Sequence, residues 1–141
     1  MPHSLVGAWR LLSYESISAT GETTLPLGPS PIGRIEYRPD GRMFALLVAA
    51  GRPSIGWSAF GDATVEEKAA AYDSAVAYYG TYEVEGDLVI HHVEASTLPA
   101  FTGNDVERYF RIDAGRLVLT FVFATPGPQA GQTLVWERAD T

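Results

Sequence analysis

The sequence predicts an all-β protein: an eight-stranded antiparallel up-and-down β-barrel with one α-helix between the third and fourth strands. Eight short runs with strand signals follow one another along the chain, and the connections RPDGR, EGD and DAGR are typical of tight turns between antiparallel neighbours. A meander of this length avoids exposed edges by closing on itself. The expected strands are residues 5–15, 33–38, 42–48, 80–85, 88–95, 105–112, 116–123 and 132–138.

The helix is predicted from the segment TVEEKAAAYDSAVAYYG, which follows the third strand. Thr64 is a good N-cap with Glu67 three residues on, and Gly80 is a plausible end of the alanine-rich run. Apolar residues recur at helical spacing and would share one face, so we expect the helix to lie against the sheet. These residues are Val65, Ala69, Tyr72, Val76 and Tyr79.

The connection before this helix, AAGRPSIGWSAFGD, carries Trp57. Connections of this length often act as lids over a binding site, although a disordered segment has the same composition. Trp57 is therefore one of the expected ligand contacts.

Composition narrows the class of protein. A chain of 141 residues with 46% hydrophobic residues suits one domain over residues 1–141. The net charge of -7, without a Lys/Arg cluster, gives no footprint for nucleic acid. The absence of cysteine excludes disulfides and thiolate chemistry and fits a reducing compartment. Without a signal-peptide pattern or a run of about 18 apolar residues, we expect a cytoplasmic protein that does not span a membrane.

Two adjacent histidines interrupt the apolar segment LVIHHVEAS. Neighbouring residues of a strand face opposite sides, so only one histidine can face the interior, and the apolar alternation favours His91. A two-residue turn at Gly86-Asp87 places Tyr82 opposite His91, on the same face. His92 would then face outward with Glu94.

An arginine stands on the apolar face of the following strand. If Ala114-Gly115 is the next two-residue turn, this face forms an apolar wall. The wall would contain Ile112, Phe110, Arg108 and Val106, opposite Leu117, Leu119, Phe121 and Phe123 respectively. A symmetric connection over residues 96–103 would also place His91 opposite Arg108, giving a transverse polar row with Tyr82.

Such polar residues on an apolar wall need partners. A buried arginine requires a carboxylate, hydrogen bonds, water or an oxygen of a ligand, unless it stacks on an aromatic ring or lies at the rim of the barrel. The alternative for His91, which is the more common one for such a residue, is a neutral structural histidine bonded to Tyr82. Tyr37 and Ser13, on the expected inner faces of strands 2 and 1, could line a cavity or belong to the packed core.

The start LVGAWRLLSYE, with Gly7 and Trp9, resembles the Gly-x-Trp signature of lipocalin barrels. In those proteins the tryptophan plugs one end of the barrel and a late arginine, matched here by Arg138 of LVWER, packs on it; such a cation over an indole has a physical basis of its own. The blocks LPLGPSPIGRIEYRPDGRM, AAYDSAVAYYGTYEVEGD and IHHVEAS look like the bacterial and fungal lipocalin-like domain family, of the calycin type. The resemblance implies a lumen, in a family that includes both carriers and biosynthetic tailoring enzymes.

The leading hypothesis is a lipocalin-like barrel that binds one small, largely apolar or amphipathic molecule, with polar side chains at the ligand's polar end. The expected ligand contacts are Tyr37, Tyr82, His91, Arg108, Phe110, Leu119, Phe121 and Trp57. An alternative is a cofactor-independent cyclase or isomerase acting on a biosynthetic intermediate such as a polyketide. In it, His91 or Tyr82 would move a proton and Arg108 would stabilise developing charge. A third hypothesis is an interaction module with a filled barrel.

We expect neither a metal nor a cofactor. His92 and Glu94 share a face, with His3 as a further candidate, but zinc normally needs at least three protein ligands and no convincing third is present. The sequence contains no phosphate loop, dinucleotide fingerprint or Gly-x-Ser-x-Gly motif. Whether the barrel forms a homodimer is left open by the sequence.

Overall fold

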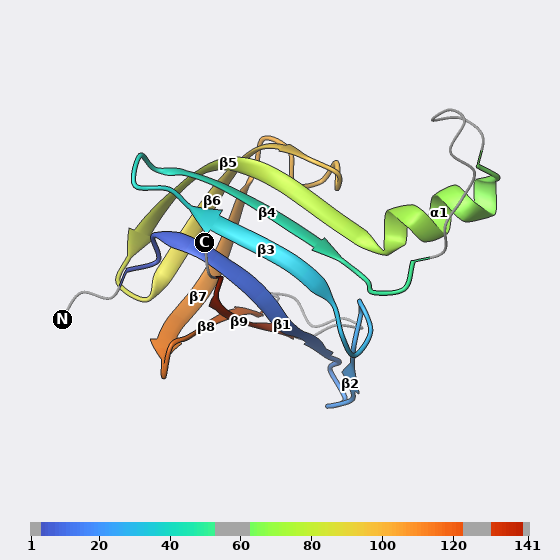
Figure 1. Ribbon diagram of the computed structural model, residues 1–141, viewed down its shortest axis with the longest axis horizontal. Coiled ribbons are helices and arrows are strands. Elements are labelled where there is room, and N and C mark those ends of the chain that lie inside the picture. The colour runs from blue at the N-terminus through green and yellow to red at the C-terminus, as the bar shows by residue number, and fades with distance from the viewer. Residues whose placement is uncertain (1–3, 53–62, 123–130, 140–141) are drawn as a thin grey trace.

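The strands form one antiparallel sheet that closes into a barrel (Figure 1). The computed structural model describes residues 4–52, 63–122 and 131–139. Its elements are β1 (Gly7–Ile17), β2 (Thr23–Thr24), β3 (Ile32–Tyr37), β4 (Arg42–Val48), α1 (Val65–Asp73), β5 (Ala75–Glu85), β6 (Leu88–Ser96), β7 (Asp105–Asp113), β8 (Arg116–Val122) and β9 (Gly131–Arg138). Pairing between β1 and β9 closes the sheet, whereas β2 adds a short pairing with β1 alone. The predicted barrel of eight strands is confirmed.

The helix begins where the sequence predicts it and ends earlier. Thr64 and Glu67 form a reciprocal capping box, with each side chain accepting a hydrogen bond from the other residue's backbone N–H. However, α1 ends at Asp73, and the next residues join β5, which pairs with β4 from Ala75 onward. The prediction that the helix continues to Gly80 is therefore wrong. Aromatic and β-branched residues after Asp73 suit a pleated strand, and the ladder to β4 pairs their backbone.

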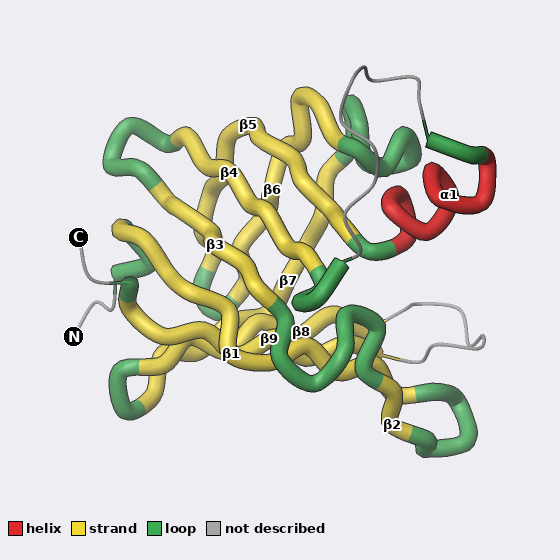
Figure 2. The backbone as a smooth tube through the Cα atoms, turned by 45° about the vertical axis from the view of Figure 1, so that its right-hand side comes forward, coloured by secondary structure: helices red, strands yellow, loops and turns green. Residues whose placement is uncertain are grey.

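The predicted apolar stripe does not exist as a helix face. Val76 and Tyr79 belong to β5, and Val65 is 77% exposed. No residue of α1 is buried, so the helix does not lie against the sheet as expected. Figure 2 shows α1 projecting from the end of the barrel at which β5 begins.

Gly80 permits a close approach of two strands. β5 and β6 change register between Tyr79 and Gly80, because Glu94 is an extra residue of β6 at a β-bulge. A Cβ atom at Gly80 would lie 1.9 Å from the carbonyl oxygen of His92. Glycine is thus required inside the sheet, rather than at the end of a helix.

One end of the barrel is plugged by Trp9, which is fully buried. The guanidinium carbon of Arg138 lies 3.9 Å from the centroid of the Trp9 ring, and its Nη1 donates to the carbonyl of Val6 at 2.7 Å. Gly7 has a φ of +128°, and a Cβ there would lie 2.6 Å from Nη1 of Arg138. The Gly7, Trp9 and Arg138 arrangement that the sequence suggests is present.

The two tight hairpins have the predicted registers. Tyr82 pairs with His91 across β5 and β6, and Phe110 pairs with Leu119 across β7 and β8. Both hairpins turn through two residues, so the turn itself fixes the pairing.

The predicted register between β6 and β7 is wrong by two residues. His91 pairs with Val106, and Arg108 pairs with Val89. The connection is not symmetric, because β6 continues to pair with β5 up to Ser96 whereas β7 begins only at Asp105. A shift of two residues keeps every side chain on its face, so Arg108 still faces inward but not opposite His91.

Candidate functional site: a cavity inside the barrel

A cavity of about 480 Å³ lies inside the barrel. It extends from Ile35 and Trp136, which lie near the plugged end, to Leu98 and Phe101 in the connection between β6 and β7. Its wall is mainly apolar, and its volume is within the range of small-molecule pockets.

The expected ligand contacts divide into two groups. His91, Arg108, Leu119 and Phe121 line the cavity. Three others do not line it: Tyr37, Tyr82 and Phe110. Trp57 lies outside the described residues.

Two tyrosines hold the imidazole of His91. Its Nε2 is 2.7 Å from Oη of Tyr37, and its Nδ1 is 2.8 Å from Oη of Tyr78. Tyr37 comes from β3 and Tyr78 from β5, so the histidine on β6 ties three strands together. His91 is 1% exposed, in agreement with the expectation that it faces inward.

His91 is a neutral histidine at ordinary pH. Burial, followed by the positive charge of Arg108, lowers its pKa from 6.5 to about 3. A neutral imidazole has one N–H donor and one acceptor nitrogen, so one tyrosine donates to the ring and the other accepts from it. Both polar atoms are therefore satisfied by protein groups.

Tyr82 is not part of this network, contrary to the expected polar row. Its hydroxyl donates to the backbone carbonyl of Arg38 at 2.8 Å. Its ring packs edge-on against Tyr37, with 4.8 Å between the ring centroids. Pairing on the same face does not bring Tyr82 to the imidazole, because the hydrogen-bond positions on the ring are already occupied from β3 and β5.

Arg108 is half-buried on the cavity wall. Its guanidinium carbon lies 4.4 Å from the centroid of Phe121, and its Nη1 donates to the carbonyl of Glu107 at 3.1 Å. Burial lowers the pKa of Arg108, against the effect of neighbouring tyrosines. Within the described part of the chain, no carboxylate forms an ion pair with it. The arginine thus stacks on an aromatic ring, as one alternative had it, while its charge remains without an anionic partner there.

Tyr14 and Tyr78 line the cavity and were not predicted to do so. Tyr78 was assigned to the helix that in fact ends before it. β1 changes register between Leu11 and Ser13, which turns Tyr14 rather than Ser13 towards the lumen. Burial raises the pKa of both tyrosines, and the positive charge of Arg108 acts in the opposite direction.

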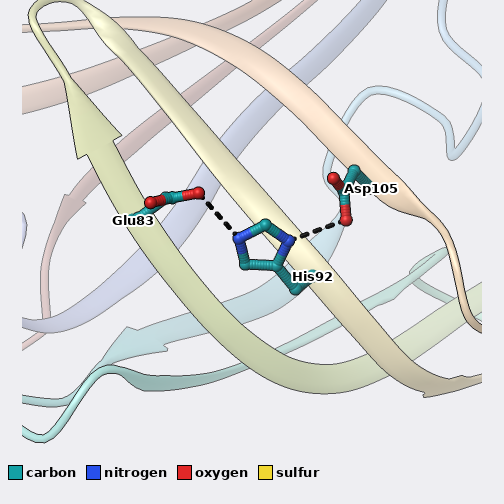
Figure 3. A network of polar contacts seen from close by, with 3 residues as sticks. All are labelled: Glu83, His92 and Asp105. Carbon is teal, nitrogen blue, oxygen red and sulfur yellow. Dashed lines mark hydrogen bonds and ion pairs between the residues drawn. The ribbon is translucent and has the colours of Figure 1, made fainter.

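His92 lies on the outside of the barrel, between β5 and β7 (Figure 3). Its Nδ1 is 2.7 Å from a carboxylate oxygen of Asp105, and its Nε2 is 3.0 Å from one of Glu83. Hydrogen bonds to Asp105 and then Glu83 raise the pKa of His92. The expected neighbour Glu94 makes neither of these contacts. The described residues hold no cluster suited to a metal ion.

No helix in the described part of the chain is both long and apolar enough to cross a membrane.

A closed antiparallel barrel with a plugged end and an internal cavity is the architecture of small-ligand-binding barrels. Comparison with family models agrees with this class: residues 6–139 match the lipocalin-like domain. The chain belongs to the lipocalin-like domain family. A comparison with the curated proteins finds no match.

Proposed function

We propose that the protein binds one small, largely apolar molecule in the barrel cavity, with Arg108 at the ligand's polar end. The observation that carries this proposal is the cavity of about 480 Å³, whose wall is mostly aliphatic and aromatic and bears a few polar side chains. This is the usual composition of a ligand pocket. Of the expected polar contacts, Tyr82 is replaced by Tyr78, which lines the cavity.

The other two hypotheses receive less support. Proton transfer by His91 is not favoured, because both ring nitrogens are hydrogen-bonded and its pKa is lowered to about 3. Tyr82 does not line the cavity, so it is poorly placed to act on a substrate there. A filled interaction module needs no cavity, and the volume inside the barrel argues against it.

The test is a titration with N-phenyl-1-naphthylamine, a neutral apolar dye whose fluorescence rises in an apolar site. We expect saturable binding by the wild-type protein and loss of binding by Ala45→Phe, because Ala45 lines the cavity and a phenyl group would fill it. Ala77→Phe is the matched control, since Ala77 does not line the cavity. Equal binding by both variants, or no saturable binding by the wild type, would contradict the proposal.

A further inference from the structure

The hydrogen-bond chain Tyr37–His91–Tyr78 has one arrangement of protons that satisfies its buried members. Tyr37 is 1% exposed. Its hydroxyl has one hydrogen-bond partner among the described residues, which is Nε2 of His91. If Tyr37 accepted from Nε2, its own O–H would have no acceptor there, which costs free energy in a buried site. Tyr37 must therefore donate to Nε2.

This donation fixes the rest of the chain. With Nε2 acting as the acceptor, the proton of the neutral imidazole lies on Nδ1, which donates to Oη of Tyr78 across 2.8 Å. The O–H of Tyr78 then needs an acceptor other than His91. Tyr78 lines the cavity, and the described residues offer its hydroxyl no second partner. Among the described residues, the O–H of Tyr78 is thus left as an unpaired donor of a residue on the cavity wall.

The positive charge of Arg108 lies near this donor. Arg108 and Tyr78 line the same cavity, and the charge of Arg108 opposes the effect of burial on the pKa of Tyr78. Two acidic residues, Asp105 and Glu107, also border the cavity, but both are exposed, and Asp105 is bonded to His92 outside the barrel. The polar part of the site therefore combines a cation and a donor, without an anionic partner from the described residues.

We infer that the ligand carries a carboxylate, whose oxygens accept hydrogen bonds from Tyr78 and Arg108 while its apolar part fills the lumen. Tyr78 and Arg108 determine this specificity, and Tyr37 and His91 are positioning residues that hold the Tyr78 hydroxyl as a donor. Charge-assisted hydrogen bonds of this kind are stronger than neutral ones and favour an anion over a neutral oxygen of the same size. This inference rests on the proposed function and specifies its ligand class.

The experiment measures displacement of N-phenyl-1-naphthylamine by two compounds with the same alkyl chain, decanoate and 1-decanol, at pH 8. We expect wild-type protein to bind decanoate more tightly than 1-decanol. Tyr78→Phe should weaken decanoate binding about tenfold, in line with the loss of a hydrogen bond to a charged group. Arg108→Leu should weaken it at least as much. In each variant the affinity for decanoate is compared with the affinity for 1-decanol, because a general change in the cavity would alter both affinities whereas loss of a carboxylate contact lowers only the first.

Matched controls lie on the outer face of the same sheet. Tyr109→Phe removes an exposed hydroxyl, and Arg111→Leu removes an exposed guanidinium from β7, the strand that bears Arg108. Neither should alter the preference for decanoate. If dye binds but the preference is absent, or survives Tyr78→Phe and Arg108→Leu, the carboxylate inference is wrong and cavity binding stands. If neither dye nor alkyl compound binds, the proposed function fails as well.

The positioning role of Tyr37 and His91 has its own spectroscopic test. Its main measurement is made on the wild-type protein, so it does not depend on the folding of a variant. Long-range ¹H–¹⁵N spectra of the protein labelled at histidine nitrogen distinguish the two neutral tautomers. We expect His91 to carry its proton on Nδ1, and Tyr37→Phe to produce a mixture of tautomers with a smaller loss of decanoate affinity than Tyr78→Phe. A proton on Nε2 in the wild-type protein would overturn the assignment of Tyr78 as the free donor.

Discussion

The acid sensitivity of folding follows from the burial of His91. The folded protein keeps this imidazole neutral until its pKa of about 3, whereas in the unfolded chain it takes up a proton near 6.5. Above pH 6.5 neither state binds the proton, and the free energy of unfolding is insensitive to this residue. Below pH 6.5 the unfolded state binds one more proton, so stability is lost as the pH falls. The loss is complete near pH 3, where the folded state also becomes protonated.

The magnitude comes from the pKa difference. Each pH unit below 6.5 removes about 1.4 kcal/mol, so His91 should lower the free energy of unfolding by roughly 2.7 kcal/mol between pH 7 and pH 4.5. That is a substantial part of the 5–15 kcal/mol typical of a folded domain. His91→Gln keeps hydrogen-bonding groups between the tyrosines and cannot take up a proton, so it should lack this dependence.

The assay is urea denaturation of wild-type protein and His91→Gln at pH 7.0, 5.5 and 4.5. The difference between the two unfolding free energies isolates His91, because all other titrating groups are common to both proteins. Parallel pH profiles would refute the reasoning. If His91→Gln does not fold, the proton resonances of the imidazole in the wild-type protein provide the test. A titration midpoint near 6.5 for His91 would likewise refute the reasoning.

Four further predictions concern other parts of the fold. Gly80→Ala should destabilise the protein more than Gly7→Ala in urea denaturation. At Gly80 the new Cβ would lie 1.9 Å from a backbone carbonyl oxygen, whereas at Gly7 it would meet the end of the Arg138 side chain and add the strain of a φ of +128°. Tyr82→Phe should leave decanoate affinity unchanged in the dye-displacement assay, since Tyr82 does not line the cavity. The pKa of exposed His92 is raised, so its ion pairs stabilise the fold below the unfolded value of 6.5 and this contribution is lost as the pH rises through the folded pKa. His92→Gln should therefore lower the free energy of unfolding more at pH 5.5 than at pH 9, and the effect should be smaller in high salt. Arg108→Leu should leave the melting temperature of the ligand-free protein unchanged or raise it, because it removes a half-buried charge without an anionic partner among the described residues.

The alternation of inward and outward side chains along a strand, together with the length of each turn, explains which parts of the fold could be predicted from the sequence. A two-residue turn leaves one register that keeps apolar residues on one face, so the pairing of Tyr82 with His91 follows from local information. The longer connection between β6 and β7 fixes no register, because its own turns decide where each strand stops. The prediction there failed by two residues, although the inward face of Arg108 was unaffected.

The missed tyrosines have separate physical causes. The segment around Tyr78 combines alanines that favour a helix with aromatic and β-branched residues that favour a strand, and its apolar spacing fits a helix. The pairing with β4 makes this segment a strand, and that contact is not local in the sequence. Tyr14 faces the lumen because of a bulge in β1, and one extra residue in a strand leaves no recognisable sequence signal. The places of Tyr14 and Tyr78 on the cavity wall could therefore not be predicted from the sequence pattern.

The free-energy cost of burying each polar side chain explains why Arg108 is stronger evidence for a ligand site than His91. The network of Tyr37, His91 and Tyr78 satisfies both imidazole nitrogens, so a structural role alone would account for the histidine. Among the described residues, Arg108 has the ring of Phe121 on one side and a single backbone carbonyl as acceptor, which compensates poorly for removing a cation from water. A leucine would pack on Phe121 at lower cost. On the proposed function, an anionic ligand would give this charge a partner, and the stability lost in the empty protein would be recovered on binding.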